Sequence, residues 1–240
     1  MRKKRPFLTV LVVAFFGISS MAVAQGMNNS LSKKEKKEGW HLLFNGKNLD
    51  GWHTYLKKDV TPAWKVKDGV IALDHGNNAE GGDLVTNEEY QNFELSMEWK
   101  ISEEGNSGII FDVHEAPKYH ETYLTGPEMQ VLDNKNAEDN KKDSHLAGSL
   151  YDIIAANPQT ANPAGKWNKV RIRLDHGHLT FWMNGKKVVE TQMWNQHWTE
   201  LVSNSKFKDW NGFAAYKKGH IALQDHGHAV WFKDIKIKPL

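Results

Sequence analysis

The sequence predicts an all-β protein of the jelly-roll sandwich class with little helix, and three observations lead to this class. Apolar and polar residues alternate along 93–101, with the apolar side chains at every odd position, as in an antiparallel strand with one buried face. Turn signals separate many short runs of this kind along the chain. Finally, the segment from 39 to 240 has the length of one large all-β domain.

Residues 1–24 have the features of a secretory signal peptide. A basic stretch at 2–5 precedes an apolar stretch from Phe7 to Ile18, and Ala22-Val23-Ala24 resembles a cleavage site of small residues. The apolar stretch is short for a membrane span, so an uncleaved anchor is the less favoured alternative and an integral membrane protein is not expected. Because the chain has no Cys, a lipoprotein anchor is excluded. We expect a soluble protein exported through the Sec route to the periplasm or the cell surface.

Residues 25–38 are polar and rich in lysine, and we expect them to form a flexible or weakly helical leader before a single domain at 39–240. Loss of residues 1–24 would remove four basic residues and no acidic one, which changes the formal net charge from +2 to −2. No basic stripe follows the leader, so the charge pattern does not favour nucleic acid as a partner.

Turn residues predict the hairpins. Asn184-Gly185 lies between two apolar runs and is the strongest hairpin signal, and Asp68-Gly69 and 175–178 predict two more. A short helix is expected within 198–207. Long loops, which on a sandwich would form the rim of a binding groove, are expected at 115–127, 134–145 and 157–165.

The segment 128–133 carries the first candidate site. If it is a strand, Glu128 and Gln130 point to one face and Met129 and Val131 to the core, although a solvated outer face would give the same alternation. The segment resembles the E-x-D-x-x-E strand of laminarinase-type glucanases, in which the first and last acids are nucleophile and general acid/base. Here Gln130 replaces the middle acid and Asp133 the last. Retaining hydrolysis needs two carboxyl groups about 5–5.5 Å apart, so ordinary glycosidase chemistry is in doubt.

Histidines in or beside the long loops supply the second set of candidates. His145 is followed by Tyr151 on the next predicted strand, and His114 precedes another long loop. A histidine is the natural general acid or base near neutral pH, and a tyrosine hydroxyl can donate to a developing oxyanion. A solvated histidine would explain the same positions equally well.

Three D-H-G segments, at 74–76, 175–177 and 225–227, form the third set. Aspartate and histidine are both metal ligands, but Asp-x-Gly is also common turn chemistry, which is the better explanation here. His226 is the member that we connect with function, together with Gln224 before it. A divalent metal ion stays an alternative, without a ligand set that can be named.

The ten tryptophans divide between core and surface. Trp99, Trp167 and Trp231 lie in strand patterns and are expected in the core, whereas an indole such as that of Trp210, in a less regular stretch, could stack on a sugar. The sequence contains no P-loop, nucleophile elbow, HExxH or EF-hand pattern. A serine or cysteine hydrolase is therefore not expected.

Six segments resemble a known family when they are taken together. They are GWHLLFNGKNLDGW at 39–52, GNSGI at 105–109, EMQVLD at 128–133, GKWN at 165–168, WMNG at 182–185 and IALQDHG at 221–227. Their order and spacing are similar to those of the 3-keto-disaccharide hydrolase family, which is abundant in gut Bacteroidetes. Relatives usually carry Arg-Asn where this chain has Lys233-Asp234. The resemblance implies a concanavalin-like jelly roll over nearly all of 39–240.

The resemblance also implies an activity on glycosides that are already oxidised at C3, as a 1,2-lyase, a 2-hydroxy-glucal hydratase or the net hydrolase. Such chemistry needs a base near C2, a stabiliser for the C3 oxyanion and an acid for the leaving group. We expect Glu128 or His145 as the base, with Asp133 orienting a histidine. The side chains expected to bind the oxidised saccharide are those of His114, Gln130, Asp133, Tyr151, Gln224 and His226.

Two other functions stay open at this point. One is a carbohydrate-binding module without catalysis, because jelly rolls often bind sugars and a fold does not fix a function. The other is a conventional endo-glucanase-like glycosidase, which a second carboxyl group within about 5.5 Å of Glu128 would favour.

Overall fold

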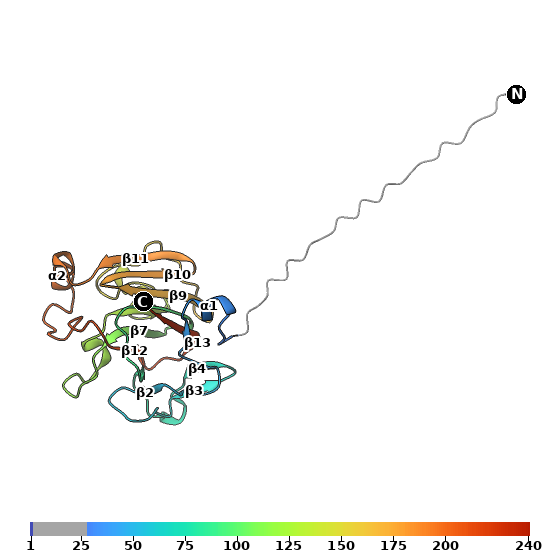
Figure 1. Ribbon diagram of the computed structural model, residues 1–240, viewed down its shortest axis with the longest axis horizontal. Coiled ribbons are helices and arrows are strands. Elements are labelled where there is room, and N and C mark those ends of the chain that lie inside the picture. The colour runs from blue at the N-terminus through green and yellow to red at the C-terminus, as the bar shows by residue number, and fades with distance from the viewer. Residues whose placement is uncertain (2–27) are drawn as a thin grey trace.

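The computed structural model describes residues 1 and 28–240, so nearly all of the predicted signal peptide and the start of the predicted leader lie outside the described residues. Two antiparallel sheets pack face to face, which confirms the predicted jelly-roll sandwich (Figure 1). The two α-helices are short, and no helix among the described residues is long and apolar enough to cross a membrane.

The larger sheet has the order β11-β10-β9-β6-β13-β4-β3, and β1 pairs with β13 outside this path. Its strands are β1 (His41–Leu42), β3 (Trp64–Lys67), β4 (Val70–Leu73), β6 (Phe93–Ile101), β9 (Asn168–Asp175), β10 (His178–Met183), β11 (Lys186–Gln192) and β13 (Val230–Pro239). The smaller sheet has the order β2-β5-β12-β7-β8. Its strands are β2 (Trp52–Thr54), β5 (Leu84–Thr86), β7 (Asn106–Val113), β8 (Glu128–Leu132) and β12 (His220–Leu223).

The core lies between the sheets and follows the alternation in the sequence. Leu95, Met97 and Trp99 of β6 are each 1% exposed and belong to the same cluster as Phe111 of β7 and Val131 of β8. The Phe111 ring meets Phe93 and Phe181 edge-on, so truncating it to alanine should cost about 3–5 kcal/mol of stability. Because neighbouring side chains on a strand point to opposite faces, the even positions of β8 are turned away from this core.

The predicted hairpins are confirmed by their backbone conformation. Asn184 and Gly185 have φ of 48° and 81°, as a tight turn between β10 and β11 requires. Asp68-Gly69 between β3 and β4 and His176-Gly177 between β9 and β10 have the same pair of positive φ angles. The predicted helix within 198–207 is α2 (Gln196–Ser203), which begins two residues earlier because the Asn195 side chain accepts from Trp198 N at 2.7 Å.

Three short 3₁₀ helices lie in the connections between strands. They are η1 (Gly76–Asn78), η2 (Thr122–Leu124) and η3 (Asp143–His145). The last two fall inside two of the predicted long loops and stand on either side of β8 in the sequence. These loops therefore shape the surroundings of β8.

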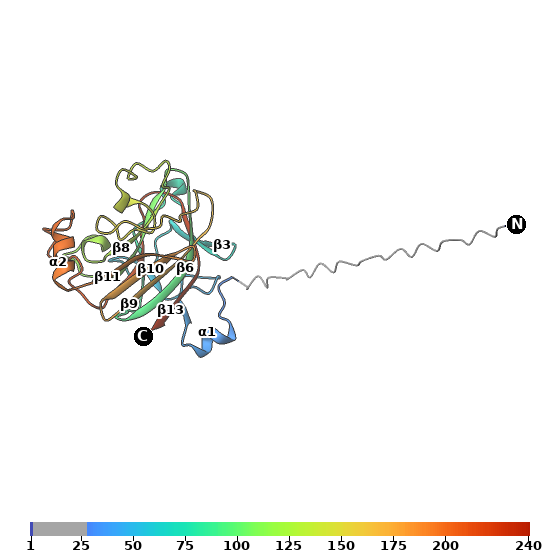
Figure 2. The same ribbon diagram turned by 90° about the horizontal axis from the view of Figure 1, so that it is seen from above.

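The described end of the predicted leader packs against the larger sheet. α1 (Lys33–Lys37) starts with a capping box between Ser32 and Glu35, and it lies beside β13 in both views (Figures 1 and 2). Glu35 also forms an ion pair with Lys236 of β13. Asn29 exchanges hydrogen bonds with Asp234 at the β13 bulge.

Candidate active site

A cavity of about 390 Å³, here called the substrate cavity, opens on the face of the smaller sheet that is turned away from the core. Strand β8 and the segment directly after β12 supply its polar wall, and the segment after α2 supplies an aromatic one. The lining residues are Asn106, Tyr123, Leu124, Glu128, Gln130, Tyr151, Lys206, Phe207, Trp210, Gln224 and His226. The structure thus brings together five of the residues selected from the sequence, Glu128, Gln130, Tyr151, Gln224 and His226.

A second, acidic cavity of about 750 Å³ adjoins the first one, and the two share Asn106, Tyr151 and His226. Glu104, Glu138 and Asp139 line the second cavity. Tyr151 therefore stands where the two cavities meet. A ligand with two sugar-sized parts could occupy both of them, with the bond between its parts near Tyr151.

The Glu128 carboxyl is positioned by a glycine on the neighbouring strand. Antiparallel pairing places Ile110 of β7 opposite Glu128 and Gly108 opposite Gln130. A Cβ atom at position 108 would lie 2.2 Å from Glu128 Oε1, so the carboxyl occupies the space that a side chain there would fill. Gly108, the second glycine of the GNSGI segment, is therefore required for the present position of the Glu128 side chain.

Glu128 combines burial with an absence of close partners. Its residue is 7% exposed, and its carboxyl makes no hydrogen bond or ion pair with any residue that the structure describes. Burial raises the pKa of Glu128 to about 8, an effect that Asp83 and Asp139 strengthen and the Lys206 ammonium opposes. A carboxyl with this pKa exchanges protons near neutral pH, and its ionised form is a much stronger base than an ordinary carboxylate.

The two glutamines of the substrate cavity leave polar atoms without partners. Gln130 Oε1 accepts from Val131 N at 3.1 Å, but the buried Nε2 has no hydrogen-bond partner among the described residues. Gln224 Oε1 is buried and equally unpaired within the described part of the chain. A buried unpaired group costs about 1–3 kcal/mol, which a polar ligand in the cavity would offset.

His145 lies behind the substrate cavity and does not line it. Its Nδ1 lies 2.7 Å from Asp139 Oδ1 and its Nε2 lies 2.8 Å from Asp152 Oδ1, so both ring nitrogens already face carboxylates. Tyr151 donates its hydroxyl to the other Asp139 oxygen at 2.8 Å. The expectation that His145 is a direct base does not fit this arrangement, because a base needs a free lone pair that reaches the substrate. His145 instead orders the two aspartates.

Asp133 and His114 also lie elsewhere. The Asp133 oxygens accept from the backbone of Glu104 and Lys135, at 2.9 and 3.1 Å, so this residue closes turns at the end of β8 and orients no histidine. His114 stacks on Tyr216, with ring centres 3.8 Å apart, and lines neither cavity. Strand alternation explains why the Asp133 side chain does not face the cavity. Asp133 directly follows β8, and the odd positions of this strand point to the core.

Sequence reasoning missed other residues of the site. Asn106 lies in the GNSGI segment at 105–109, whose resemblance to the family was the only sequence feature that pointed to it. Asp139 and Lys206 come from irregular segments, where no periodicity indicates which way a side chain points. The Trp210 indole does line the substrate cavity, beside Phe207.

The D-H-G segments mainly form turns. Asp74 Oδ1 accepts from Gly76 N and Asp225 Oδ1 accepts from Gly227 N, each at 2.9 Å, as predicted for Asp-x-Gly. His75 Nε2 also lies 2.8 Å from Asp225 Oδ1, which joins two of the segments. Among residues 28–240, no three histidine or acidic side chains converge as a metal site requires.

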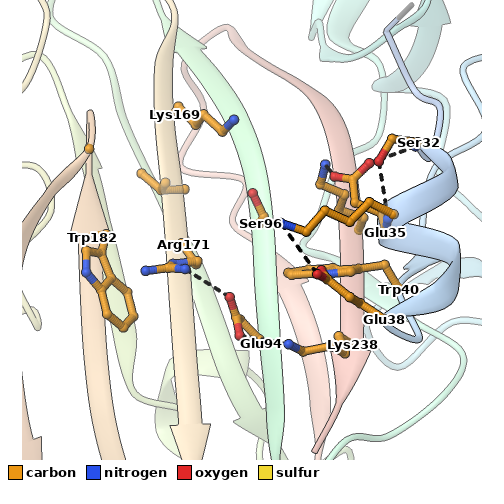
Figure 3. A pocket seen from close by; sticks show the side chains of 14 residues that line it. Ser32, Glu35, Glu38, Trp40, Glu94, Ser96, Lys169, Arg171, Trp182 and Lys238 are labelled. Atoms are coloured by element: carbon orange, nitrogen blue, oxygen red, sulfur yellow. Dashed lines mark hydrogen bonds and ion pairs between the residues drawn. The ribbon is translucent and has the colours of Figure 1, made fainter. Parts of the chain in front are cut away.

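A different cavity, here called the outer groove, lies on the outer face of the larger sheet (Figure 3). It has a volume of about 650 Å³ and runs between α1 and the strands β6, β9 and β10. Several of its charged side chains pair with one another: Glu94 binds Arg171 at 3.1 Å and Lys238 at 3.2 Å. The Arg171 guanidinium covers the Trp182 ring at 3.8 Å, so this indole face is not free to stack on a sugar.

Comparison with known proteins gives a consistent result. Residues 39–238 match the family model of the 3-keto-alpha-glucoside-1,2-lyase-like domain. The 3-keto-disaccharide hydrolase of Bacteroides thetaiotaomicron is 36% identical over 238 residues, which cover 88% of this chain and 82% of that protein.

Two crystal structures of candidate glycosyl hydrolases from Parabacteroides distasonis are also similar. One superposes with a TM-score of 0.82 at 34% identity and covers 89% of this chain and 99% of its own. The other has a TM-score of 0.65 at 26% identity and covers 84% of this chain and 99% of its own.

Proposed function

The chain belongs to the family of 3-keto-alpha-glucoside-1,2-lyase-like domains, and we propose that it cleaves 3-keto-glycosides by 1,2-elimination followed by addition of water. The main support is the isolated, buried carboxyl of Glu128 in a cavity of sugar size. Hydrolysis of an unoxidised glycoside needs a pair of carboxyl groups beside the bond. Proton removal next to a ketone needs one strong base, and Glu128 has the burial and the pKa for this role.

The proposed reaction balances without an oxidant or a reductant. The ketone at C3 acidifies the proton at C2, and the Glu128 carboxylate takes that proton while the electron pair moves to the C3 oxygen. The pair then returns, C1 and C2 become doubly bonded, and the bond from C1 to the leaving oxygen breaks. Water then adds its hydroxyl group at C1 and its other proton restores the Tyr151 hydroxyl, while Glu128 returns its proton to C2. The product is the free 3-keto sugar, and the net reaction consumes one water.

We assign the proton for the leaving group to Tyr151. Its hydroxyl stands where the two cavities meet, which is where the leaving oxygen would depart. Burial raises the pKa of Tyr151, and the hydrogen bond to Asp139 raises it further. A hydroxyl of this kind stays protonated until a strongly basic alkoxide forms beside it. In this structure the hydroxyl proton is bonded to Asp139, whose other oxygen faces His145, so the proton turns from Asp139 to the leaving oxygen as the bond to C1 breaks.

The unpaired amides of Gln130 and Gln224, together with His226, are assigned to the binding of sugar hydroxyls. One free donor and one free acceptor suit a hydroxyl group, which can accept from the first and donate to the second. The aromatic wall of Phe207 and Trp210 can pack against a sugar face.

The test compares release of the leaving group from a 3-keto-glucoside and from its unoxidised parent. We expect release from the keto substrate alone. Release from the parent would point to a conventional glycosidase and contradict the elimination mechanism. Binding of either sugar without release would make the protein a carbohydrate-binding module.

We also propose that the reaction takes place outside the cytoplasm. The support is the arrangement of basic, apolar and small residues within 1–24. Fractionation of the producing cell tests this proposal, because a full-length, unprocessed protein in the cytosolic fraction would contradict export.

A further inference from the structure

Lys206 follows α2 and is fixed beside the substrate cavity by its backbone. Its N–H donates to Asp152 Oδ2 at 2.7 Å. The other Asp152 oxygen lies 2.8 Å from His145 Nε2 and 3.0 Å from Lys142 Nζ. Lys206 is therefore attached to the same ordered group that holds Tyr151 through Asp139.

The ammonium of Lys206 turns back over this group although the residue as a whole is exposed. Its Nζ lies 4.1 Å from the centre of the Tyr151 ring and 5.2 Å from that of Phe207. It forms no ion pair within 4.0 Å among the described residues. Its charge is thus held near the cavity by ring faces and not by a carboxylate, which leaves its N–H donors free for a ligand.

The charges around Lys206 explain why a cation matters here. Carboxylates of Glu128, Asp139 and Asp152 face it, and Lys142 stands farther along the same group. Partial burial lowers the pKa of Lys206 while the three carboxylates raise it. Among the described residues that line the substrate cavity, Lys206 is the only Lys or Arg. An anion formed in this acidic surrounding would be repelled without it.

We propose that Lys206 is a catalytic residue, whose ammonium donates a hydrogen bond to the C3 oxygen as that oxygen becomes negative. This proposal rests on the proposed function, because only a 3-keto substrate forms such an oxyanion. Lys206 keeps its proton: the charge on oxygen appears when Glu128 takes the C2 proton and disappears when the C1 bond breaks. A donor that interacts only with the charged C3 oxygen lowers the activation barrier and leaves the binding energy of the substrate unchanged.

The test uses the full chain with Lys206→Met, Lys206→Arg and, as the matched control, Lys208→Met, two residues away and exposed outside both cavities. Two rates are measured: release from a 3-keto-glucoside, and exchange of the C2 proton with deuterated water in a 3-keto sugar that has no group to lose at C1. We expect Lys206→Met to slow both rates by about 10²–10³, the usual effect of one oxyanion donor. KM should change little, Lys206→Arg should retain part of the rate, and Lys208→Met should match wild type.

Each other outcome overturns the proposal in a recognisable way. A raised KM at unchanged kcat would make Lys206 a ground-state contact, and slowed release with unchanged exchange would place it at the leaving group. Losses of activity in Lys206→Met and Lys206→Arg that follow their losses in melting temperature would indicate a structural role. An inactive wild type would refute the proposed function and this inference with it, whereas an active wild type with an equally active Lys206→Met would refute the inference alone.

Discussion

The substrate cavity and the outer groove lie on opposite outer faces of one sandwich and differ in how their polar groups are used. The outer groove is larger and carries more charge, yet Glu94 there is bound by both Arg171 and Lys238. The substrate cavity is smaller, but Glu128 and the amides of Gln130 and Gln224 have free polar atoms within the described residues. Unpaired buried groups, more than size or charge, therefore distinguish a chemical site from a solvated surface.

Replacing one glutamate in each region is the strongest test of this comparison. We expect Glu128→Gln to lower kcat/KM on a 3-keto-glucoside by about 10²–10⁴, the range for loss of a general base. The isosteric change keeps the volume and removes the proton acceptor. Glu94→Gln in the outer groove should stay within about twofold of wild type, because Glu94 lines neither the substrate cavity nor the acidic cavity beside it. Equal losses in the two variants would remove the distinction between the regions.

A change that leaves Glu128 in the sequence but moves its carboxyl is the next test. Gly108→Ala places a methyl group where Glu128 Oε1 now lies, so the carboxyl has to shift. We expect a loss of about 10²-fold in kcat/KM, as for a misplacement of about 1 Å. In a Glu128→Gln background the same change should cost little more, because both act on one group. Additive losses would show that Gly108 matters for another reason.

Much of the fold could be predicted because it repeats simple patterns. The alternation along β6 and the turn residues Asn184-Gly185 specify strand faces and hairpins locally. The same alternation correctly placed Glu128 and Gln130 on one face of β8. It failed for Trp167 and Trp231, which are only partly buried: both lie near the Lys100 ammonium instead of in the core.

Strand periodicity predicted only part of the site. It assigned the even positions of β8 and Gln224, directly after β12. No such rule applies to irregular segments, where residue type and neighbouring motifs point to Tyr151 and His226. His145 and Lys206 could not be placed, since their positions depend on contacts with Asp139 and Asp152 that the sequence does not indicate. The expectation of His145 as an alternative base to Glu128 rests on its residue type and its place beside a long loop, and neither indicates that both ring nitrogens face carboxylates.

The pH dependence of activity separates a base from an acid at position 128. If Glu128 acts as the base, kcat/KM on a 3-keto-glucoside should rise as pH increases through about 8 and fall about tenfold for each unit below that value. Lys206 lowers this pKa and Asp83 and Asp139 raise it, so the midpoint should move upward in Lys206→Met. A profile that falls above pH 8 would make Glu128 the proton donor and reverse its assigned role.

The dependence of folding stability on pH is the smallest expected effect, and its sign differs between the two regions. The folded-state pKa of Glu128 is raised, to about 8, so its ionisation opposes folding as pH rises from about 4.5 towards 8. Glu128→Gln should therefore raise the melting temperature more at pH 8 than at pH 5. In the outer groove, the hydrogen bond from Lys236 is the main cause that lowers the pKa of Glu35 to about 2. The Glu35 carboxylate therefore contributes to stability above about pH 4.5, and this contribution is lost as pH falls towards 2.

Glu35→Gln should accordingly lower the melting temperature at pH 7 and have no such effect near pH 2. Because Glu35 is partly exposed, the loss at pH 7 should stay below about 1 kcal/mol. Thermal unfolding of the two variants at pH 2, 5, 7 and 8 checks the signs against wild type. Stabilisation by Glu128→Gln combined with destabilisation by Glu35→Gln would show that one region gives up stability for chemistry while the other holds the sandwich together. If Glu128→Gln were instead destabilising at pH 8, its carboxyl would have to be paired in the folded protein, and the case for a free base in the substrate cavity would fail.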